Sequence, residues 1–338
     1  MTVYTPQDAQ RKRFFRQDDT LPEGTALRGR YTVLRALGGG ALGLTYACYD
    51  RQSRENVAVR EFFPEKLCER AEHGLNVSPR GMAAGQAFIA GADEFYAEYG
   101  KLMSVRGSTN VVDVRDCFFE NCTAYAVTEL YDGMDLQTYL RLRGTFLSAG
   151  EAVFLLQQLT DGLIVVHSLS MLHGDISARN VFLVKNGPAK LIDFGAARPY
   201  LADEPVHADG TTDEPWTDIR ALGETVYYAC TGYRAPEPNV AAAGTLSPLP
   251  APLRGTLLPM LTDDPRVRFS SVFELFHAVN GIDVPAVRPE LPEGSVEPYA
   301  LTLRAERDKL SQNRRIALVY GALALLLVGV LLYLLATH

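Results

Sequence analysis

Three short segments carry side chains suited to phosphate and metal chemistry, and they follow one another along the chain. The first is Gly38-Gly39-Gly40-Ala41-Leu42-Gly43, a G-x-G-x-x-G pattern. Glycine lets main-chain amides approach phosphate oxygens because no Cβ intervenes. The pattern also fits plain hairpin glycines or a dinucleotide-binding turn, but such a turn must open a helix. Residues 44–47 instead continue as a strand, which favours a glycine flap over phosphate groups.

The other two segments supply acids and an amide. In His173-Gly174-Asp175-Ile176-Ser177-Ala178-Arg179-Asn180, an aspartate precedes an asparagine by five residues. This spacing can place a base near a hydroxyl and an amide oxygen on a metal ion. Asp193-Phe194-Gly195 follows an apolar run and offers a second carboxylate to the same metal. Structural roles for Asp175 and Asp193 are possible, but their order with Asn180 favours catalysis.

The elements that must position these segments change character along the chain. Strand-like runs rich in β-branched and aromatic residues cover residues 31–37, 44–50, 57–62, 111–119 and 123–130, and a helix is expected about residues 92–103. The last two runs predict a hairpin that turns at Glu120-Asn121. Ser148 and Glu151 then form a capping-box pattern before an amphipathic helix, and further helices are expected at residues 219–230 and 271–279.

Composition is that of a globular protein. Of 338 residues, 47% are apolar and 22% are charged. The net charge of −7 gives no reason to expect nucleic acid as a partner. Five cysteines form no metal-ligand spacing, which favours reduced thiols in a reducing compartment. Residues 1–19 contain no apolar core, so a signal peptide is not expected.

Residues 316–336 form an uncharged apolar run of 21 residues. At about 1.5 Å per helical residue this run spans a hydrocarbon layer roughly 30 Å thick. A buried core helix is the alternative, but such helices are seldom apolar on every face. We therefore predict a single-pass C-terminal membrane anchor in contact with lipid. Its N-terminal side is expected in the cytoplasm because basic residues precede it, namely Arg304, Arg307, Lys309, Arg314 and Arg315.

With all three motifs in this order, the chain resembles the eukaryotic-type Ser/Thr protein kinases of bacteria over residues 21–281. Residues 21–25 with Arg30-Tyr31, and Glu61-Phe62-Phe63-Pro64, resemble one bacterial subgroup. The resemblance implies an α+β bilobal fold, ATP with Mg²⁺ or Mn²⁺, and a protein as substrate or signalling partner. We expect a tail at 1–20, a small β-rich N-lobe at 21–130 and a larger helical C-lobe at 131–283. A linker with a juxtamembrane helix at 284–315 and the transmembrane helix at 316–336 follow.

The resemblance also assigns roles to single residues. Asp175 corresponds to the catalytic base, Asn180 and Asp193 to the metal ligands, and Arg179 to a phosphate-contacting residue. Glu98 matches the glutamate of the small-lobe helix and is expected to pair with Arg60. Asp218 matches an aspartate that supports the catalytic loop, and Arg268 a late structural arginine. The residues assigned to the nucleotide are Gly38, Gly40, Gly43 and Ala58, then Thr128 behind the adenine, the main chains of Glu129 and Tyr131, and Asp135 near the ribose.

Three departures from the family pattern bear on function. Arg60 stands where the family has its phosphate-binding lysine, and this exchange is not conservative at a phosphate site. Gly174 replaces the arginine before the catalytic aspartate, so switching through a phosphorylated activation segment is not expected. Asp193 and Asp218 are 25 positions apart with no Ala-Pro-Glu between them. Ala235-Pro236-Glu237 follows the helix expected at Asp218, so it does not occupy the position of the family motif. A reduced substrate-docking shelf, and no glutamate partner for Arg268, are therefore expected.

These features predict a membrane-anchored Ser/Thr protein kinase that transfers the ATP γ-phosphoryl group to protein hydroxyls. The alternative is an ATP-binding pseudokinase that acts as a membrane-tethered signalling scaffold, as Arg60 and the missing shelf would suggest. A small-molecule kinase is a third reading, because His-Gly-Asp also resembles the aminoglycoside and choline kinases.

Overall fold

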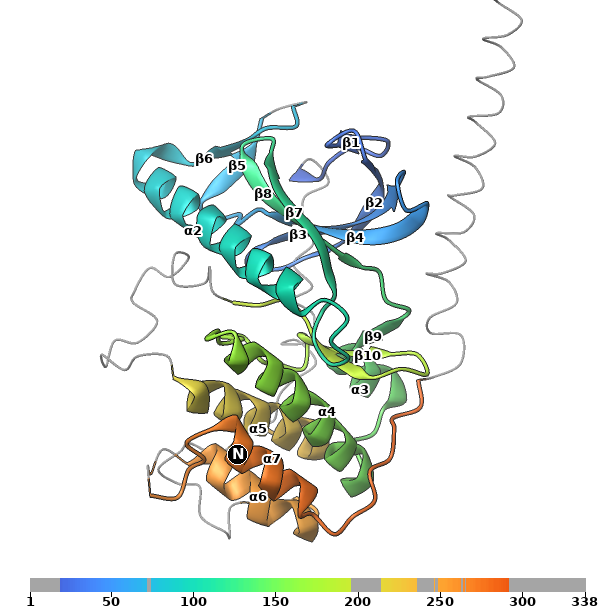
Figure 1. Ribbon diagram of the computed structural model, residues 1–338, viewed down its shortest axis with the longest axis vertical. Helices are drawn as coiled ribbons and strands as arrows, with labels where there is room; N and C mark the ends of the chain where they lie inside the picture. The colour runs from blue at the N-terminus through green and yellow to red at the C-terminus, as the bar shows by residue number, and fades with distance from the viewer. Residues whose placement is uncertain are drawn as a thin grey trace, which may run out of the picture. The chain divides into compact units, whose positions relative to one another are not determined.

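The computed structural model describes residues 19–71, 74–195, 214–235, 246, 249–262, 264 and 266–291. All of them belong to the first of two compact units, which covers residues 1–293 (Figure 1). The second unit, residues 294–338, lies outside the described residues. The predicted juxtamembrane and transmembrane helices fall in that second unit.

The N-terminal part of the described chain is a six-stranded antiparallel sheet in the order β1-β2-β3-β4-β8-β7. The strands are β1 (Ala26–Leu27), β2 (Tyr31–Gly39), β3 (Gly43–Asp50), β4 (Glu55–Phe62), β7 (Val114–Glu120) and β8 (Thr123–Glu129). The predicted strands are confirmed. The β7–β8 turn lies at Asn121 and Cys122, one residue later than expected, and both have a left-handed φ (51° and 61°). Two left-handed residues match the twist of a two-residue hairpin.

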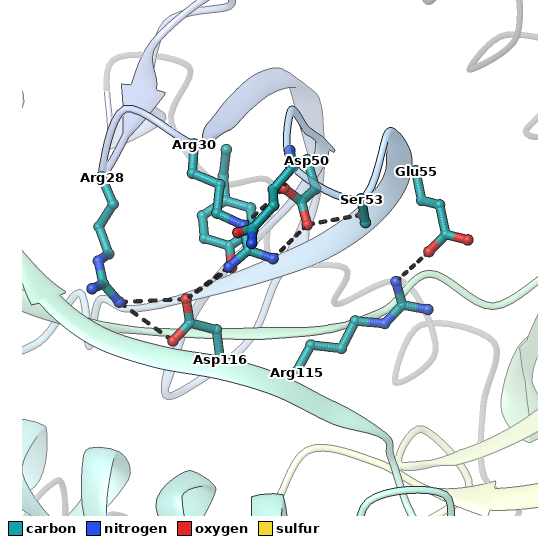
Figure 2. A network of polar contacts seen from close by, with 9 residues as sticks. Arg28, Arg30, Asp50, Ser53, Glu55, Arg115 and Asp116 are labelled. Carbon is teal, nitrogen blue, oxygen red and sulfur yellow. Dashed lines mark hydrogen bonds and ion pairs between the residues drawn. The ribbon is translucent and has the colours of Figure 1, made fainter.

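A polar network links β2 and β3 to β7, an edge strand of this sheet (Figure 2). The Arg30 guanidinium donates to both oxygens of Asp50 at 2.8 and 2.7 Å, which joins the start of β2 to the end of β3. Tyr31 donates its hydroxyl proton to Asp116 on β7 at 2.8 Å. The Arg30 hydrogen bonds hold the pKa of the buried Asp50 carboxyl well below its usual range. These contacts join the neighbouring strands β2 and β3 to β7, which lies at the far end of the sheet order.

Helix α2 (Gly81–Leu102) packs against β7 and β8, as Figure 1 shows. The rings of Phe88 and Phe95 each lie 5.6 Å from the ring of Phe62 on β4. The sequence predicted only the second half of this helix, because its first half is rich in alanine and glycine and lacks apolar periodicity. A hairpin that was not predicted, β5 (Cys68–Arg70) with β6 (Val77–Pro79), leads into α2, and η2 (Met103–Val105) follows it.

The C-terminal part is helical and has α4 at its centre. Its helices are α3 (Leu136–Arg143), α4 (Ala149–Ser168), α5 (Pro215–Thr231), α6 (Ala251–Leu261) and α7 (Val272–Asn280). The predicted capping box is confirmed, since the Ser148 side chain accepts from the Glu151 amide while the Glu151 carboxylate accepts from the Ser148 amide. Within the described residues, α4 alone has the length and apolar composition of a membrane span. Leu155, Leu159 and Leu163 are fully buried, so we interpret α4 as a core helix.

A small three-stranded sheet in the order β11-β10-β9 connects this core to the chemical motifs. It consists of β9 (Gly133–Asp135), β10 (Val181–Val184) and β11 (Ala189–Leu191). Asn180 directly precedes β10, and Asp193 lies two residues after β11. Because β10 and β11 pair antiparallel, with Val181 opposite Leu191, the two motifs are brought side by side.

Residues 284–291, expected as part of a linker, lie along α4. The Val287 amide donates to the Gly150 carbonyl at 2.9 Å. A Cβ on Gly150 would lie 2.7 Å from Val287 Cγ2. The Arg288 guanidinium lies 5.9 Å from the centroid of the Phe154 ring. This part of the segment therefore belongs to the packed C-lobe.

Candidate active site

The glycine motif forms the turn between β2 and β3, where the Gly40 amide donates to the Gly43 carbonyl at 2.8 Å. A Cβ on Gly43 would lie only 1.9 Å from the Glu61 carbonyl oxygen, so close packing of β3 on β4 requires glycine there. A Cβ on Gly38 or Gly40 would meet nothing within 4 Å. The motif is thus a hairpin and opens no helix, as predicted, and two of its glycines face open space.

The loop between α4 and β10 carries Asp175. Asp218 on α5 accepts hydrogen bonds from the main chain of this loop. The Asp218 carboxylate accepts from the amides of His173 at 2.8 Å and Gly174 at 2.9 Å. His167 Nε2 donates to the same carboxylate at 3.0 Å. Burial alone would raise the pKa of Asp218, but these hydrogen bonds outweigh burial and lower it. Asp218 therefore remains an anion and fixes the main chain just before Asp175.

His173 is fully buried and connects this loop to the Asp-Phe-Gly segment. Its ring lies 4.4 Å from that of Phe194, and its carbonyl accepts from the Gly195 amide at 2.8 Å. Nε2 donates to the Ile192 carbonyl at 3.1 Å, while Nδ1 accepts from the Asp175 amide at 3.3 Å. Burial lowers the pKa of His173, so the ring is a neutral structural group.

Asn180 holds Asp175 and Asp193 together. Its Nδ2 donates to the Asp175 carbonyl at 2.8 Å and lies 3.5 Å from the Asp193 carbonyl. The Ile192 amide in turn donates to the Asn180 carbonyl at 2.9 Å. Since Nδ2 faces the two carbonyls, Oδ1 remains as an acceptor. Asp193 has a left-handed φ of 61°, and its side chain is 39% exposed.

A cleft of about 820 Å³ contains these groups. Six of the predicted site residues line it together, namely Gly40, Arg60, Asp175, Arg179, Asn180 and Asp193. The other predicted residues do not line this cleft; they are Gly38, Gly43, Ala58, Glu98, Glu129, Tyr131 and Asp135.

Arg60, on β4, reaches across the cleft. Its Nη1 forms an ion pair with Oδ1 of Asp193. Its Nε and Nη1 are both buried, and neither has a hydrogen-bond partner within the described part of the chain. Glu98, the expected partner of Arg60, lies on α2 with only 2% exposure. Burial raises the pKa of Tyr99 to about 12. The charge of Arg60 lowers this pKa and the charge of Glu98 raises it, so both side chains influence the same hydroxyl group. The pairing of Arg60 with Glu98 stays a prediction.

At the expected adenine end, Ala58 pairs with Thr128, which precedes Glu129 at the end of β8. The Glu129 amide donates to the Asp113 carbonyl at 3.0 Å, so its own carbonyl is the group left for a base. The Tyr131 hydroxyl accepts from the Asp113 amide at 2.8 Å. Buried Lys190, which the sequence did not single out, lies 5.0 Å from the Tyr131 ring centroid.

Two of the remaining assignments have defined contacts. Asp135 caps α3 by accepting from the Thr138 amide at 2.8 Å through Oδ1, which leaves Oδ2 for a ribose hydroxyl. Arg179 Nε donates to Gln137 Oε1 at 2.7 Å, and this contact draws the Arg179 side chain toward α3.

Arg268 has an aromatic partner that sequence reasoning missed. Its guanidinium lies 4.2 Å from the ring centroid of Trp216, at the start of α5. The sequence indicated no glutamate partner for Arg268. Its guanidinium instead stacks on the single tryptophan of the chain.

The residues present fit a nucleotide with Mg²⁺. Mg²⁺ is commonly bound by one or two protein oxygens together with substrate phosphates. Asn180 Oδ1 and the Asp193 carboxylate provide such oxygens, and the unpartnered Arg60 Nε can donate to a phosphate. Across the residues that the structure describes, no group of three or more His, Cys, Asp and Glu side chains could hold a metal by itself.

Comparisons with known proteins agree with this geometry. The family described as "Protein kinase domain" matches residues 31–238. CBL-interacting protein kinase 22 of Oryza sativa subsp. japonica is 32% identical over 204 residues, covering 58% of this chain and 43% of the relative. Serine/threonine-protein kinase pkn2 of Myxococcus xanthus is 27% identical over 256 residues, covering 69% of this chain and 28% of the relative. The chain spans less than half the length of either relative.

Solved structures share the fold. The apo form of PpkA-294 superposes with a TM-score of 0.64 at 24% identity, covering 77% of this chain and 99% of that one. The PknI kinase domain of Mycobacterium tuberculosis gives a TM-score of 0.58 at 22% identity, covering 77% of this chain and 98% of that one. The bilobal arrangement expected from the motifs is therefore confirmed. The chain belongs to the protein kinase family.

Proposed function

We propose that the chain transfers the γ-phosphoryl group of ATP to serine or threonine hydroxyls of a protein. The observation that carries this proposal is the convergence of Asp175, Asn180 and Asp193 on one cleft that the glycine hairpin also lines. Retention of both acids and the amide favours an enzyme, because a scaffold has no need of all three. The serine/threonine kinases among the relatives support the same reaction.

The described residues have separate roles in this reaction. ATP with Mg²⁺ supplies the phosphoryl group and the positive charge that offsets its transfer. Asp175 orients the acceptor hydroxyl and accepts its proton as the new O–P bond forms. Asn180 and Asp193 would hold the metal, and the glycine hairpin about Gly40 would lie over the phosphates. Asp218 keeps the Asp175 loop in place through its two main-chain hydrogen bonds.

We further propose that residues 316–336 anchor the kinase domain to a membrane with the domain on the cytoplasmic side. The uncharged run of 21 residues and the basic residues before it support this proposal. The test is fractionation of the full chain beside a version that ends at residue 315. The full chain should resist carbonate extraction from membranes and the shorter one should be released, whereas equal release of both would refute the anchor.

A second candidate function is that of an ATP-binding pseudokinase that acts as a scaffold. The contact between Arg60 and Asp193 favours it, because a protein cation already occupies a metal-binding carboxylate. Arginine also replaces the family lysine at this position.

The experiment that tests the proposed reaction is phosphate transfer from labelled ATP by the full chain in detergent. The protein itself and a generic protein mixture serve as acceptors, and Asp175→Asn is the control. Label that appears with the unaltered chain and is lost in the variant supports the kinase. No label from a folded, ATP-binding sample would favour the scaffold.

A further inference from the structure

The cleft extends past Asp175 along α5 and just beyond its end, where it is lined by residues that had no assigned role. They are Arg220, Ala221, Glu224, Thr225, Tyr228 and Arg234. If Asp175 orients the acceptor hydroxyl, the substrate residues on either side of that hydroxyl must lie against these six residues. The six residues therefore contact the sequence that flanks the phosphorylated residue.

Among the described residues that line the cleft, positive charges outnumber negative ones. Four of these residues are arginines and three carry carboxylates. The Asp193 carboxylate forms its ion pair with Arg60. The Glu224 carboxylate accepts from Arg220 Nε at 3.0 Å, one helical turn away. The third carboxylate is that of Asp175, which the proposed reaction uses.

Two arginines remain, Arg179 and Arg234, and both are exposed. Arg179 Nε donates to the amide oxygen of Gln137 at 2.7 Å, a neutral partner that leaves the full positive charge in place. Within the described part of the chain, no carboxylate forms an ion pair with either Arg179 or Arg234. Both guanidinium groups line the same cleft as Asp175.

Arginine forks bind carboxylates through two parallel hydrogen bonds, which gives geometric selectivity as well as affinity. Complementary charge inside a cleft also speeds association and disfavours partners of the same sign. A basic segment placed here would meet two like charges, whereas an acidic segment would complete both forks.

We propose that Arg179 and Arg234 select an acceptor segment in which aspartate or glutamate flanks the phosphorylated hydroxyl. This inference rests on the proposed function and adds the class of protein substrate. It assigns Arg234 as a specificity-determining residue and gives Arg179 a role toward the acceptor chain.

The test is binding of labelled peptides by the full chain in detergent, measured by fluorescence anisotropy with a non-hydrolysable ATP analogue and Mg²⁺. Three peptides share one central serine and carry glutamate, glutamine or lysine at the flanking positions. The glutamate peptide should bind about tenfold more tightly than the lysine peptide, the factor that 1.4 kcal/mol represents. The ratio should fall at high salt because partly exposed charges are screened.

Arg234→Glu should abolish or reverse this preference, and Arg179→Gln should reduce it. The matched control is Arg141→Glu, which changes an exposed arginine on α3 that does not line the cleft and should leave the ratio unaltered. Thermal melting of each variant checks its folding, and Arg179→Gln serves where Arg234→Glu does not fold. Equal binding of the three peptides, or an unchanged ratio in both cleft variants, would overturn the inference.

Phosphate transfer to the same peptides separates this inference from the proposed function. An acidic preference in binding without any transfer would contradict the kinase reaction and leave the charge selectivity intact. Transfer to all three peptides with equal kcat/KM would contradict the selectivity alone.

Discussion

Arg60 of β4 forms an ion pair with Asp193 of the Asp-Phe-Gly segment across the active-site cleft. The cation thus comes from the small-lobe sheet and the carboxylate from the end of the small C-lobe sheet. Because Asp193 is also the expected metal ligand, Mg²⁺ bound there would share this carboxylate with Arg60. The exchange of lysine for arginine therefore concerns metal affinity as well as phosphate contact.

Arg60→Lys should lower the Mg²⁺ concentration needed for nucleotide binding. Lysine is a compact point charge and lacks the planar fork that engages a carboxylate. We expect the half-saturating Mg²⁺ concentration to fall about fivefold, equivalent to roughly 1 kcal/mol of released competition. Thermal shift in the presence of ATP, titrated with Mg²⁺, measures this quantity without requiring turnover. An unchanged or higher Mg²⁺ requirement would show that Arg60 does not compete for Asp193.

Asp218→Asn should disrupt the catalytic loop. The buried carboxylate accepts from two main-chain amides and from His167, and an asparagine must turn a donor toward one of them. Charge-assisted hydrogen bonds of this kind contribute about 1.5–3 kcal/mol each. We expect a loss of about 3 kcal/mol in the free energy of unfolding, together with loss of phosphate transfer. Asp264→Asn, at a partly exposed carboxylate paired with the highly exposed Arg266, is the control and should change the free energy of unfolding far less.

The stacking of Arg268 on Trp216 gives a spectroscopic test, because the chain has a single tryptophan. Arg268→Ala should shift the tryptophan emission and lower stability by about 1 kcal/mol, the range of an accessible cation–π contact. Arg266→Ala, two positions away and highly exposed, should change neither signal. Identical emission from both variants would mean that Arg268 does not cover the indole ring.

The pair of Arg30 and Asp50 predicts a pH-dependent stability (Figure 2). Since the folded-state pKa of Asp50 is lowered below its unfolded value, its contribution is complete above that unfolded value and is lost as pH falls. Asp50→Asn should therefore destabilise the chain at pH 6, and the difference from the unaltered chain should shrink below about pH 4. Urea unfolding across this range measures it. A difference in unfolding free energy that does not vary with pH would refute the linkage. The control is Glu69→Gln, at an exposed ion pair, which should change the stability little at any pH.

Much of the fold was predictable because local patterns agreed with it. The strands from Tyr31 to Phe62 alternate or run apolar, and the box at Ser148 marks the start of α4. The first half of α2 was not predictable, since its glycines and alanines carry no helical period. That half is a helix because the β5–β6 hairpin leads into it and Phe88 packs against Phe62.

That Asp175, Asn180 and Asp193 lie together was predictable from their spacing, but their surroundings were not. The distance in sequence between Arg60 and Asp193 hides their contact, which exists because β4 and the end of β11 face one cleft. Trp216 lies 52 positions before Arg268 and is uncharged, so the sequence did not indicate that the two side chains are in contact. Arg234, just after the end of α5, was not singled out in the sequence either, and only its position in the cleft gives it a role.

The most direct test of the kinase reaction measures ATP binding and phosphate transfer on one sample of the full chain. Calorimetry with ATP and Mg²⁺ is followed by transfer of labelled phosphate, for the unaltered chain and for Asp175→Asn. The account predicts comparable ATP affinity for both proteins, with transfer by the unaltered chain alone. Comparable ATP binding with no transfer by either protein would contradict it and identify the chain as a nucleotide-binding scaffold.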